Sequence, residues 1–135
     1  MSYIADTNIY VAAANDGDFR VWFATFMLMH GPLLISSVVI AEILIGIPDT
    51  RNHDATARAL TAGADPLAPT PAAWRLAAHA IARLGGDQVT KSRSFWNDAL
   101  LAAQCSEMGA TLLTSNTADF RRLGRYIAID IVAPE

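Results

Sequence analysis

The sequence has few of the residues on which disulfide-bonded, zinc-binding or highly charged proteins depend. Its 135 residues include one cysteine, Cys105, which excludes an internal disulfide framework and a cysteine-based zinc site. Charged residues make up 17% of the chain, compared with about 25% in an average folded protein. Hydrophobic residues make up 53%, so the chain can build a core and intrinsic disorder is excluded.

The chain also lacks an excess of basic residues. Its 13 acidic and 10 basic residues give a formal net charge of −3, which argues against a domain that holds nucleic acid by charge alone. If metal ions neutralised four of the acids, however, 9 acids would face 10 bases. Net charge therefore does not exclude an RNA partner.

Neither a targeting signal nor a membrane-spanning run is visible. Residues 1–6 contain no basic region, and Asp6 interrupts the first apolar run. The longest hydrophobic stretch, residues 33–47, is too short to span a bilayer and contains Glu42. We therefore expect a soluble protein with no membrane association. The single cysteine is compatible with the reducing cytoplasm.

Short apolar segments alternate with longer helical patterns along the chain. This alternation predicts an α/β domain with a mainly parallel sheet, in which ligands collect at the carboxyl ends of the strands. No repeat or linker divides the sequence, so we expect a single domain over residues 1–135. The expected strands are residues 3–5, 33–35, 67–68, 111–114 and 126–132, and the expected helices are residues 7–14, 19–30, 38–47, 71–84, 95–108 and 117–123.

Two of the expected helices carry further detail. Residues 19–30 are apolar almost all round, which predicts a helix buried on more than one side. The helix after Thr70 has proline at its first position and ends at Gly85 and Gly86. Its expected buried face consists of Trp74, Ala77, Ala78, Ile81 and Leu84.

Four acidic residues stand alone in apolar segments that otherwise read as core. A carboxylate in such a place is costly unless something compensates its charge, and none of these segments contains a basic residue. Four carboxylates brought together would also raise one another's pKa. A divalent cation such as Mg²⁺, which prefers oxygen ligands, would remove both costs. The four residues are Asp6 in residues 1–14, Glu42 in 21–48, Asp98 in 94–106 and Asp119 in 108–120.

Each acid also has a simpler interpretation. Asp6 would serve as the N-cap of a helix that begins at Thr7. Asn116 would cap the last helix, with Asp119 in its first turn, where the helix dipole favours a negative charge. Glu42 and Asp98 fit such roles less well, because acids are seldom fully buried without a partner.

The four acids lie in segments that together resemble one known family. The segments are residues 4–8 (IADTN), 36–43 (SSVVIAEI), 97–103 (NDALLAA) and 112–120 (LLTSNTADF). Each motif is weak by itself, but their order and spacing over nearly the whole chain are specific. On these motifs the chain resembles a PIN-domain ribonuclease of the VapC type, the toxin of bacterial and archaeal toxin–antitoxin pairs.

The resemblance implies a three-layer α/β/α sandwich and a Mg²⁺- or Mn²⁺-dependent endoribonuclease. Asp6, Glu42, Asp98 and Asp119 carry over as catalytic acids, and Asp6, Asp98 and Asp119 as metal ligands. Metal-activated water would attack the scissile phosphorus in line, and the metal would stabilise the leaving oxygen. The implied partners are RNA, a small antitoxin protein and a second copy of the chain. Residues 19–29 would face one of these protein partners or belong to the core.

Polar residues near the acids are candidates for supporting roles. Thr7, Asn8, Thr114 and Asn116 would orient ligands or water behind the metal, although turn formation and strand packing also suit such residues. Arginines close behind Asp119 would contact RNA phosphates or would simply be solvated. These arginines are Arg121, Arg122 and Arg125.

Two positions depart from the family pattern. Asn116 stands where many relatives have an acid, which leaves open whether one or two metals bind. Ser115 stands where relatives often have arginine, which leaves open how the substrate phosphate is held.

Two other acid-dependent functions are disfavoured by the sequence, and one non-catalytic function remains as an alternative. A haloacid-dehalogenase-like phosphatase would need a second aspartate at the position of Asn8, and a phosphoaspartate receiver would need an acid next to Asp6. A non-catalytic binding module that keeps the scaffold and pairs with a protein is a further possibility. The sequence does not identify the RNA: transfer RNA and a ribosomal RNA loop both suit a protein that reads exposed loops.

Overall fold

A parallel three-stranded sheet lies at the centre of the molecule. The computed structural model describes residues 1–62, 65–85 and 92–135. The strands are β1 (Tyr3–Ala5), β2 (Thr111–Leu113) and β3 (Asp130–Val132), in the order β1-β2-β3. Both pairs are parallel, and Thr111 lies opposite Tyr3 on one side and Asp130 on the other. The expected parallel sheet is thus confirmed.

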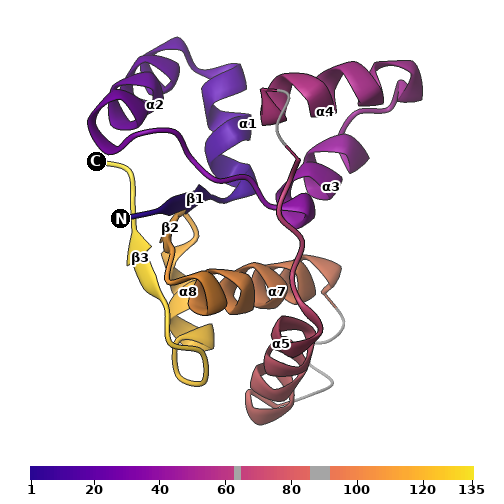
Figure 1. The fold of residues 1–135 in the computed structure, drawn as a ribbon, viewed down its shortest axis with the longest axis vertical. Coiled ribbons are helices and arrows are strands. Elements are labelled where there is room, and N and C mark those ends of the chain that lie inside the picture. The colour runs from indigo at the N-terminus through magenta and orange to yellow at the C-terminus, as the bar shows by residue number, and fades with distance from the viewer. Residues whose placement is uncertain (63–64, 86–91) are drawn as a thin grey trace.

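Helices cover both faces of this sheet. One layer consists of α1 (Thr7–Asn15) and α2 (Gly17–His30), and the other contains α7 (Arg93–Met108) and α8 (Thr117–Leu123) (Figure 1). Successive strand residues point to opposite faces, as the pleat requires. Tyr3 and Ala5 pack with α1 and α2, whereas Ile4 packs with α7. This arrangement confirms the expected three-layer α/β/α architecture.

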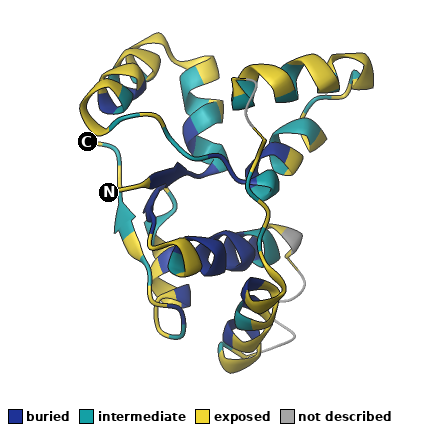
Figure 2. Ribbon diagram, in the orientation of Figure 1, coloured by how far each residue is buried: buried dark blue, intermediate teal, exposed yellow. Residues whose placement is uncertain are grey.

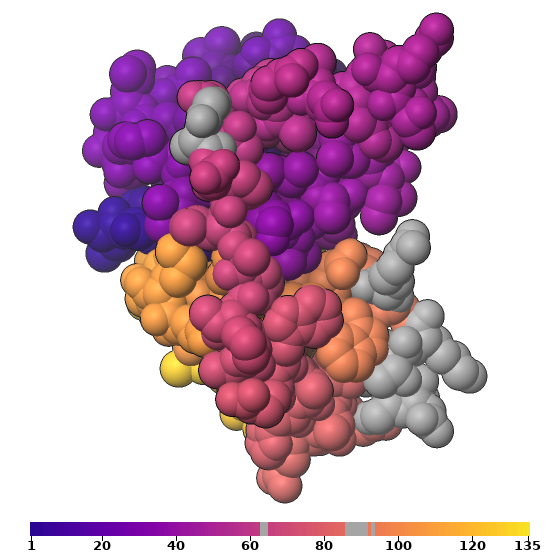
Figure 3. Space-filling view, turned by 45° about the vertical axis from the view of Figure 1, so that its right-hand side comes forward, coloured from indigo at the N-terminus to yellow at the C-terminus, as the bar shows by residue number. Residues whose placement is uncertain are grey.

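The remaining helices flank these layers. Helix α3 (Ser37–Ile45) leads through the short 3₁₀ helix η1 (Thr50–Asn52) into α4 (His53–Thr61). In the space-filling view the chain then crosses the surface toward α5 (Pro71–Arg83), in the other half of the molecule (Figure 3). Both chain ends lie near β1 and β3 (Figure 1).

Four expected strands are shorter than predicted, and β2 is the least changed, since it ends at Leu113 instead of Thr114. Residues 33–35 and 67–68 contribute only isolated parallel bridges, from Leu34 to Ile4 and from Leu67 to Ser36. Pro32 has no N–H to donate, and Ser36 already caps α3. Only three residues lie between them, which leaves little chain for strand pairing. In the segment 126–132, turn hydrogen bonds to Leu123 hold Tyr126 and Ile127, and the strand begins at Asp130.

The buried face of α5 also differs from the expected one. Trp74 is 53% exposed and Ala78 is exposed, whereas Ala73, Ala77, Ala80 and Ile81 are buried. A stripe of alanines lets α5 lie close against α7, and this packing fixes the helix rotation more strongly than the size of Trp74 does. The left-handed φ of +116° at Gly85 fits the expected helix end, and Gly86 lies outside the described residues.

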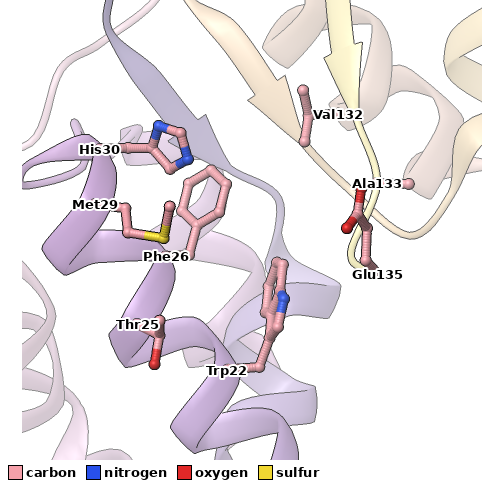
Figure 4. A pocket seen from close by; sticks show the side chains of 8 residues that line it. All are labelled: Trp22, Thr25, Phe26, Met29, His30, Val132, Ala133 and Glu135. Carbon is pink, nitrogen blue, oxygen red and sulfur yellow. The ribbon is translucent and has the colours of Figure 1, made fainter.

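Helix α2 is buried along one face and not on several. Phe23 and Phe26 are buried, whereas Val21, Leu28 and Met29 are 68%, 87% and 74% exposed (Figure 2). A cavity of about 250 Å³ separates α2 from the C-terminal residues, with Phe26 on one wall and Val132 on the other (Figure 4). Among the helices described, none is long and apolar enough to cross a membrane.

Candidate active site

The four isolated acids come together at the carboxyl end of the sheet, although four different elements carry them. Asp6 directly follows β1, and Asp119 lies in the first turn of α8, which follows β2. Glu42 belongs to α3 and Asp98 to α7. Burial raises the pKa of Asp98 most, and the charges of Asp6, Glu42 and Asp119 raise it further, so the other three acids act on Asp98 through their charge. These four side chains therefore lie within range of one another's charges.

Asp6 is the most firmly held of the four acids. Asp6 is 3% exposed, and its Oδ1 accepts a hydrogen bond of 2.8 Å from the backbone N–H of Thr7. Its Oδ2 accepts one of 2.8 Å from the Thr114 hydroxyl and one of 3.0 Å from the Asn8 amide. Asp6 thus both caps α1 and belongs to the acid cluster, so its interpretation as a helix cap and its interpretation as a cluster acid do not exclude each other.

The loop between β2 and α8 connects the other acids through Asn116. The Nδ2 of Asn116 donates to Oδ2 of Asp98 at 3.3 Å and to Oδ2 of Asp119 at 3.1 Å. Its backbone N–H donates to the Thr114 hydroxyl at 3.0 Å. Asn116 occupies the N-cap position of α8, but its side chain makes no capping hydrogen bond. The side chain of Asn116 therefore binds the two acids and not the backbone at the start of α8.

Glu42 lies at the rim of the cluster. Its Oε1 accepts a hydrogen bond of 2.9 Å from the Thr7 hydroxyl, which links α3 to the start of α1. The side chain also borders a mainly apolar cavity of about 390 Å³ between α1, α3 and α4. A second cavity, of about 600 Å³, shares Tyr10 and Leu60 with the first, so α4 stands between two open apolar spaces.

Burial and mutual repulsion raise the pKa values of three acids. The pKa of Asp98 reaches about 8, first because burial removes its hydration and then because of the charges on the other three acids. Burial also raises the pKa of Asp6 and of Glu42, although hydrogen bonds from Thr114, Thr7 and other neighbours partly oppose the effect. These three acids therefore hold their protons more strongly than isolated carboxyl groups do.

One of the three candidate arginines reaches the acids. The guanidinium of Arg122 lies 3.6 Å from Oδ1 of Asp119 and covers the ring of Phe95, with 5.1 Å between its Cζ and the ring centroid. Arg121 and Arg125 are exposed, and neither forms an ion pair with an acid of the cluster in the part of the chain described.

The chain matches one protein family over most of its length. Residues 3–126 match the model of the PIN domain. The protein belongs to the PIN-domain family. A search of curated protein sequences found no significant match.

Solved structures share the fold of this PIN domain at low sequence identity. VapBC2 from Rickettsia felis, bound to a promoter DNA fragment, has a TM-score of 0.73 and 19% identity over 100% of both chains. VapBC-1 from nontypeable Haemophilus influenzae has a TM-score of 0.73 and 20% identity over 98% of both chains. DNA-bound VapBC from Salmonella typhimurium has a TM-score of 0.72 and 17% identity, again over 98% of both chains.

The donor atoms of this PIN domain fit a hard divalent cation. The cluster offers carboxylate oxygens with hydroxyl and amide groups behind them, and oxygen ligands of this kind are those that Mg²⁺ prefers. The acids are not assembled as closely as expected, however. Within residues 1–62, 65–85 and 92–135, no three Asp, Glu, His or Cys side chains converge closely enough to hold one metal ion.

Sequence reasoning gave no role to two residues at this site. Asn97 forms a hydrogen bond that lowers the pKa of Glu42, and Phe95 positions Arg122. Both lie on α7 within three residues before Asp98, so a turn-by-turn reading of that helix would have identified them as neighbours. Cys105 packs in the core at 0% exposure.

Proposed function

We propose that this PIN domain is a metal-dependent endoribonuclease that acts as the toxin of a VapC-type toxin–antitoxin pair. The proposal is supported mainly by one observation: Asp98 is buried near three acids from other elements, and its burial and their charges together raise its pKa to about 8. A structural role for these acids would not require all four in one place. Phosphodiester hydrolysis provides a reason, because it needs a cation held by oxygen ligands next to the substrate.

In this proposal Asp6, Asp98 and Asp119 hold Mg²⁺ or Mn²⁺, and Glu42 lines the same cleft. The bound ion would supply a water of lowered pKa and would offset the negative charge of the phosphodiester. Thr114 and Asn8 keep the carboxylate of Asp6 oriented, and Asn116 spans two of the other acids.

The substrate side of the site is assigned to basic residues near α8. Arg122 is at the edge of the acid cluster, where a phosphate group of RNA would approach. Arg121 and Arg125 are exposed close behind it and would contact neighbouring phosphates. Ser115 is exposed between β2 and α8 and has no positive charge. In this proposal the arginines therefore supply the positive charge that binds phosphate.

RNA cleavage with and without metal tests the proposed activity. The purified protein should cleave RNA from a mixture of transfer and ribosomal RNA in Mg²⁺ or Mn²⁺, and chelation should stop the reaction. Asp6→Asn should lower the cleavage rate by about 10²- to 10³-fold, the effect of losing one preorganised charged group in an active site. Asp54→Asn on exposed α4 is the matched control.

The alternative is a binding module that keeps the PIN scaffold without catalysis. The separation of the acids, with an asparagine between two of them, favours this alternative. If no RNA is cleaved with either Mg²⁺ or Mn²⁺ while the protein still binds a protein partner, the endoribonuclease assignment is wrong. The non-catalytic binding module is then the remaining function.

The proposed protein partners are a small antitoxin and a second copy of the chain, within the cytoplasm. The two apolar cavities on either side of α4 support a protein partner, because apolar space next to a charged cleft suits a segment with both kinds of side chain. A short reading frame upstream should encode a small DNA-binding protein. Size-exclusion chromatography of the two proteins together and of this chain alone would test both associations.

A further inference from the structure

Asp119 differs from the other three acids in its partners. Its Oδ2 accepts from the Asn116 amide at 3.1 Å, and its Oδ1 lies 3.6 Å from the guanidinium of Arg122. In the described part of the chain, it is the one acid of the cluster that forms an ion pair with a basic side chain. Each oxygen of Asp119 therefore has one polar or charged neighbour from the chain itself.

Arg122 is held in place by a second contact that does not involve Asp119. Its guanidinium covers the ring of Phe95 at 5.1 Å, and Phe95 is 6% exposed and fixed in the core. Phe95 lies on α7 one turn before Asp98, so this contact keeps the guanidinium at the edge of the acid cluster. Loss of the ion pair to Asp119 would leave the contact with Phe95 intact.

The other arginines near α8 do not share this geometry. Arg122 is three residues after Asp119, a spacing that brings two side chains together on a helix. Arg121 is two residues after Asp119, and side chains at that spacing do not face each other. Arg121 therefore provides a matched control for removing the same charge from the same helix.

We propose that Arg122 is a built-in counter-ion that holds Asp119 while no divalent cation is bound and gives up this carboxylate when a cation binds. The freed guanidinium stays on the Phe95 ring and pairs with a phosphate of the incoming polynucleotide. The inference rests on the proposed function, because it requires the acids to bind a cation.

The ion pair is weak enough to be exchanged in this way. The Arg122 and Asp119 side chains are 46% and 37% exposed, and pairs with such exposure typically change an equilibrium constant by about fivefold or less. A divalent cation held by three carboxylates would offer Asp119 a stronger partner. Because the cation frees Arg122, cation binding and phosphate binding should strengthen each other by the same factor.

Direct Mn²⁺ titration, followed by electron paramagnetic resonance without nucleic acid, tests the exchange. Arg122→Ala should bind Mn²⁺ about two- to fivefold more tightly than the wild type, because Asp119 no longer has to leave a partner. Arg121→Ala should bind as the wild type does. Arg122→Gln, which keeps the length of the side chain but not its charge, repeats the measurement if the alanine variant does not fold.

A second measurement follows the phosphate. Fluorescence anisotropy of a labelled short oligothymidylate serves as a backbone probe, since phosphate contacts do not depend on the base. Mn²⁺ should tighten its binding to the wild type and to Arg121→Ala, and should do so less for Arg122→Ala. Arg122→Lys should recover part of the gain, because it restores the charge without the planar contact to Phe95.

The outcomes separate the inference from the proposed function. If Arg122→Ala and Arg121→Ala bind Mn²⁺ equally, or if Arg122→Ala binds it more weakly, the exchange is wrong. The cation site itself would still stand if Asp6→Asn abolished Mn²⁺ binding and RNA cleavage. If the wild type binds no Mn²⁺ and cleaves no RNA, the proposed function and the exchange both fail.

Discussion

The acid cluster has an inner and an outer pair, and the two pairs are stabilised differently. Asp6 and Asp98 form the inner pair, at 3% and 6% exposure, whereas Glu42 and Asp119 form the half-buried outer pair. The inner pair depends on neutral donors from the surrounding loops, and one outer acid has an arginine beside it. Burial therefore makes a negative charge more costly on the inner pair, whereas the outer pair remains accessible to other binding partners.

The largest expected effect on stability comes from neutralising the inner Asp98. Its pKa of about 8 lies above the ordinary 3.8, so the folded protein favours the protonated form and loses stability as the pH rises from about 4 to 8. Asp98→Asn should therefore stabilise the metal-free protein at pH 8 by roughly 2–4 kcal/mol, allowing for partial exposure of the group. Urea unfolding between pH 4 and 9 with chelator measures the difference, which should vanish at the acid end.

Asp54→Asn on α4 is the control for this experiment, since it removes one exposed acid of the same type. An equal gain in stability for both variants would mean that net charge, and not the buried cluster, causes the pH dependence.

Divalent cations should stabilise the wild type more than they stabilise Asp98→Asn. Under the proposed function, Mg²⁺ or Mn²⁺ at about 100 times its dissociation constant should stabilise the wild type by about 2.7 kcal/mol. Asp98→Asn should gain far less, because it has lost a ligand. Thermal unfolding at pH 8 with increasing Mg²⁺ measures this. A rise in Tm of equal size in both proteins would place the cation elsewhere.

Removing a donor to the inner pair should have a smaller effect. Thr114→Val deletes the buried hydroxyl that donates to Asp6 at 2.8 Å and accepts from the Asn116 backbone. We expect a loss of about 1–3 kcal/mol at pH 8, the cost of leaving a buried charged group without its partner. Thr111→Val is the matched control, because Thr111 is 6% exposed on the preceding strand. Equal losses would show a general packing effect.

Removing a donor to the outer pair should have the smallest effect. Thr7→Val deletes the hydroxyl that donates to Glu42 at 2.9 Å, and water can replace it at the half-buried rim. Stability should fall by about 0.5–1 kcal/mol, while the pKa of Glu42 rises further because this hydrogen bond lowers it. Denaturant unfolding and the carboxyl NMR signal of Glu42 measure the two effects. Thr25→Val on α2 controls for deleting a helical hydroxyl.

Much of the fold follows from local signals in the sequence. Asp6, Ser36, Thr70 and Ser92 all cap the helices that follow them, and a left-handed Gly109 ends α7. Such signals involve a few neighbouring residues, so they are readable without the rest of the chain. The lengths of the strands and the rotation of α5 were predicted less well, because they depend on which distant segments pair and pack.

The sequence by itself identified the four acids whose charges interact in the folded protein. Asp6, Glu42, Asp98 and Asp119 are conspicuous because each is isolated in an apolar segment, and a buried charge must have a compensating partner. Only the tertiary structure decided how that compensation is shared. Thr114 and Asn116 lie far from Asp6 and Asp98 in the chain, and Arg122 meets Phe95 across two helices. Hydrogen bonds and charge interactions act over a few ångströms, so only the fold determines which side chains are close enough to form them.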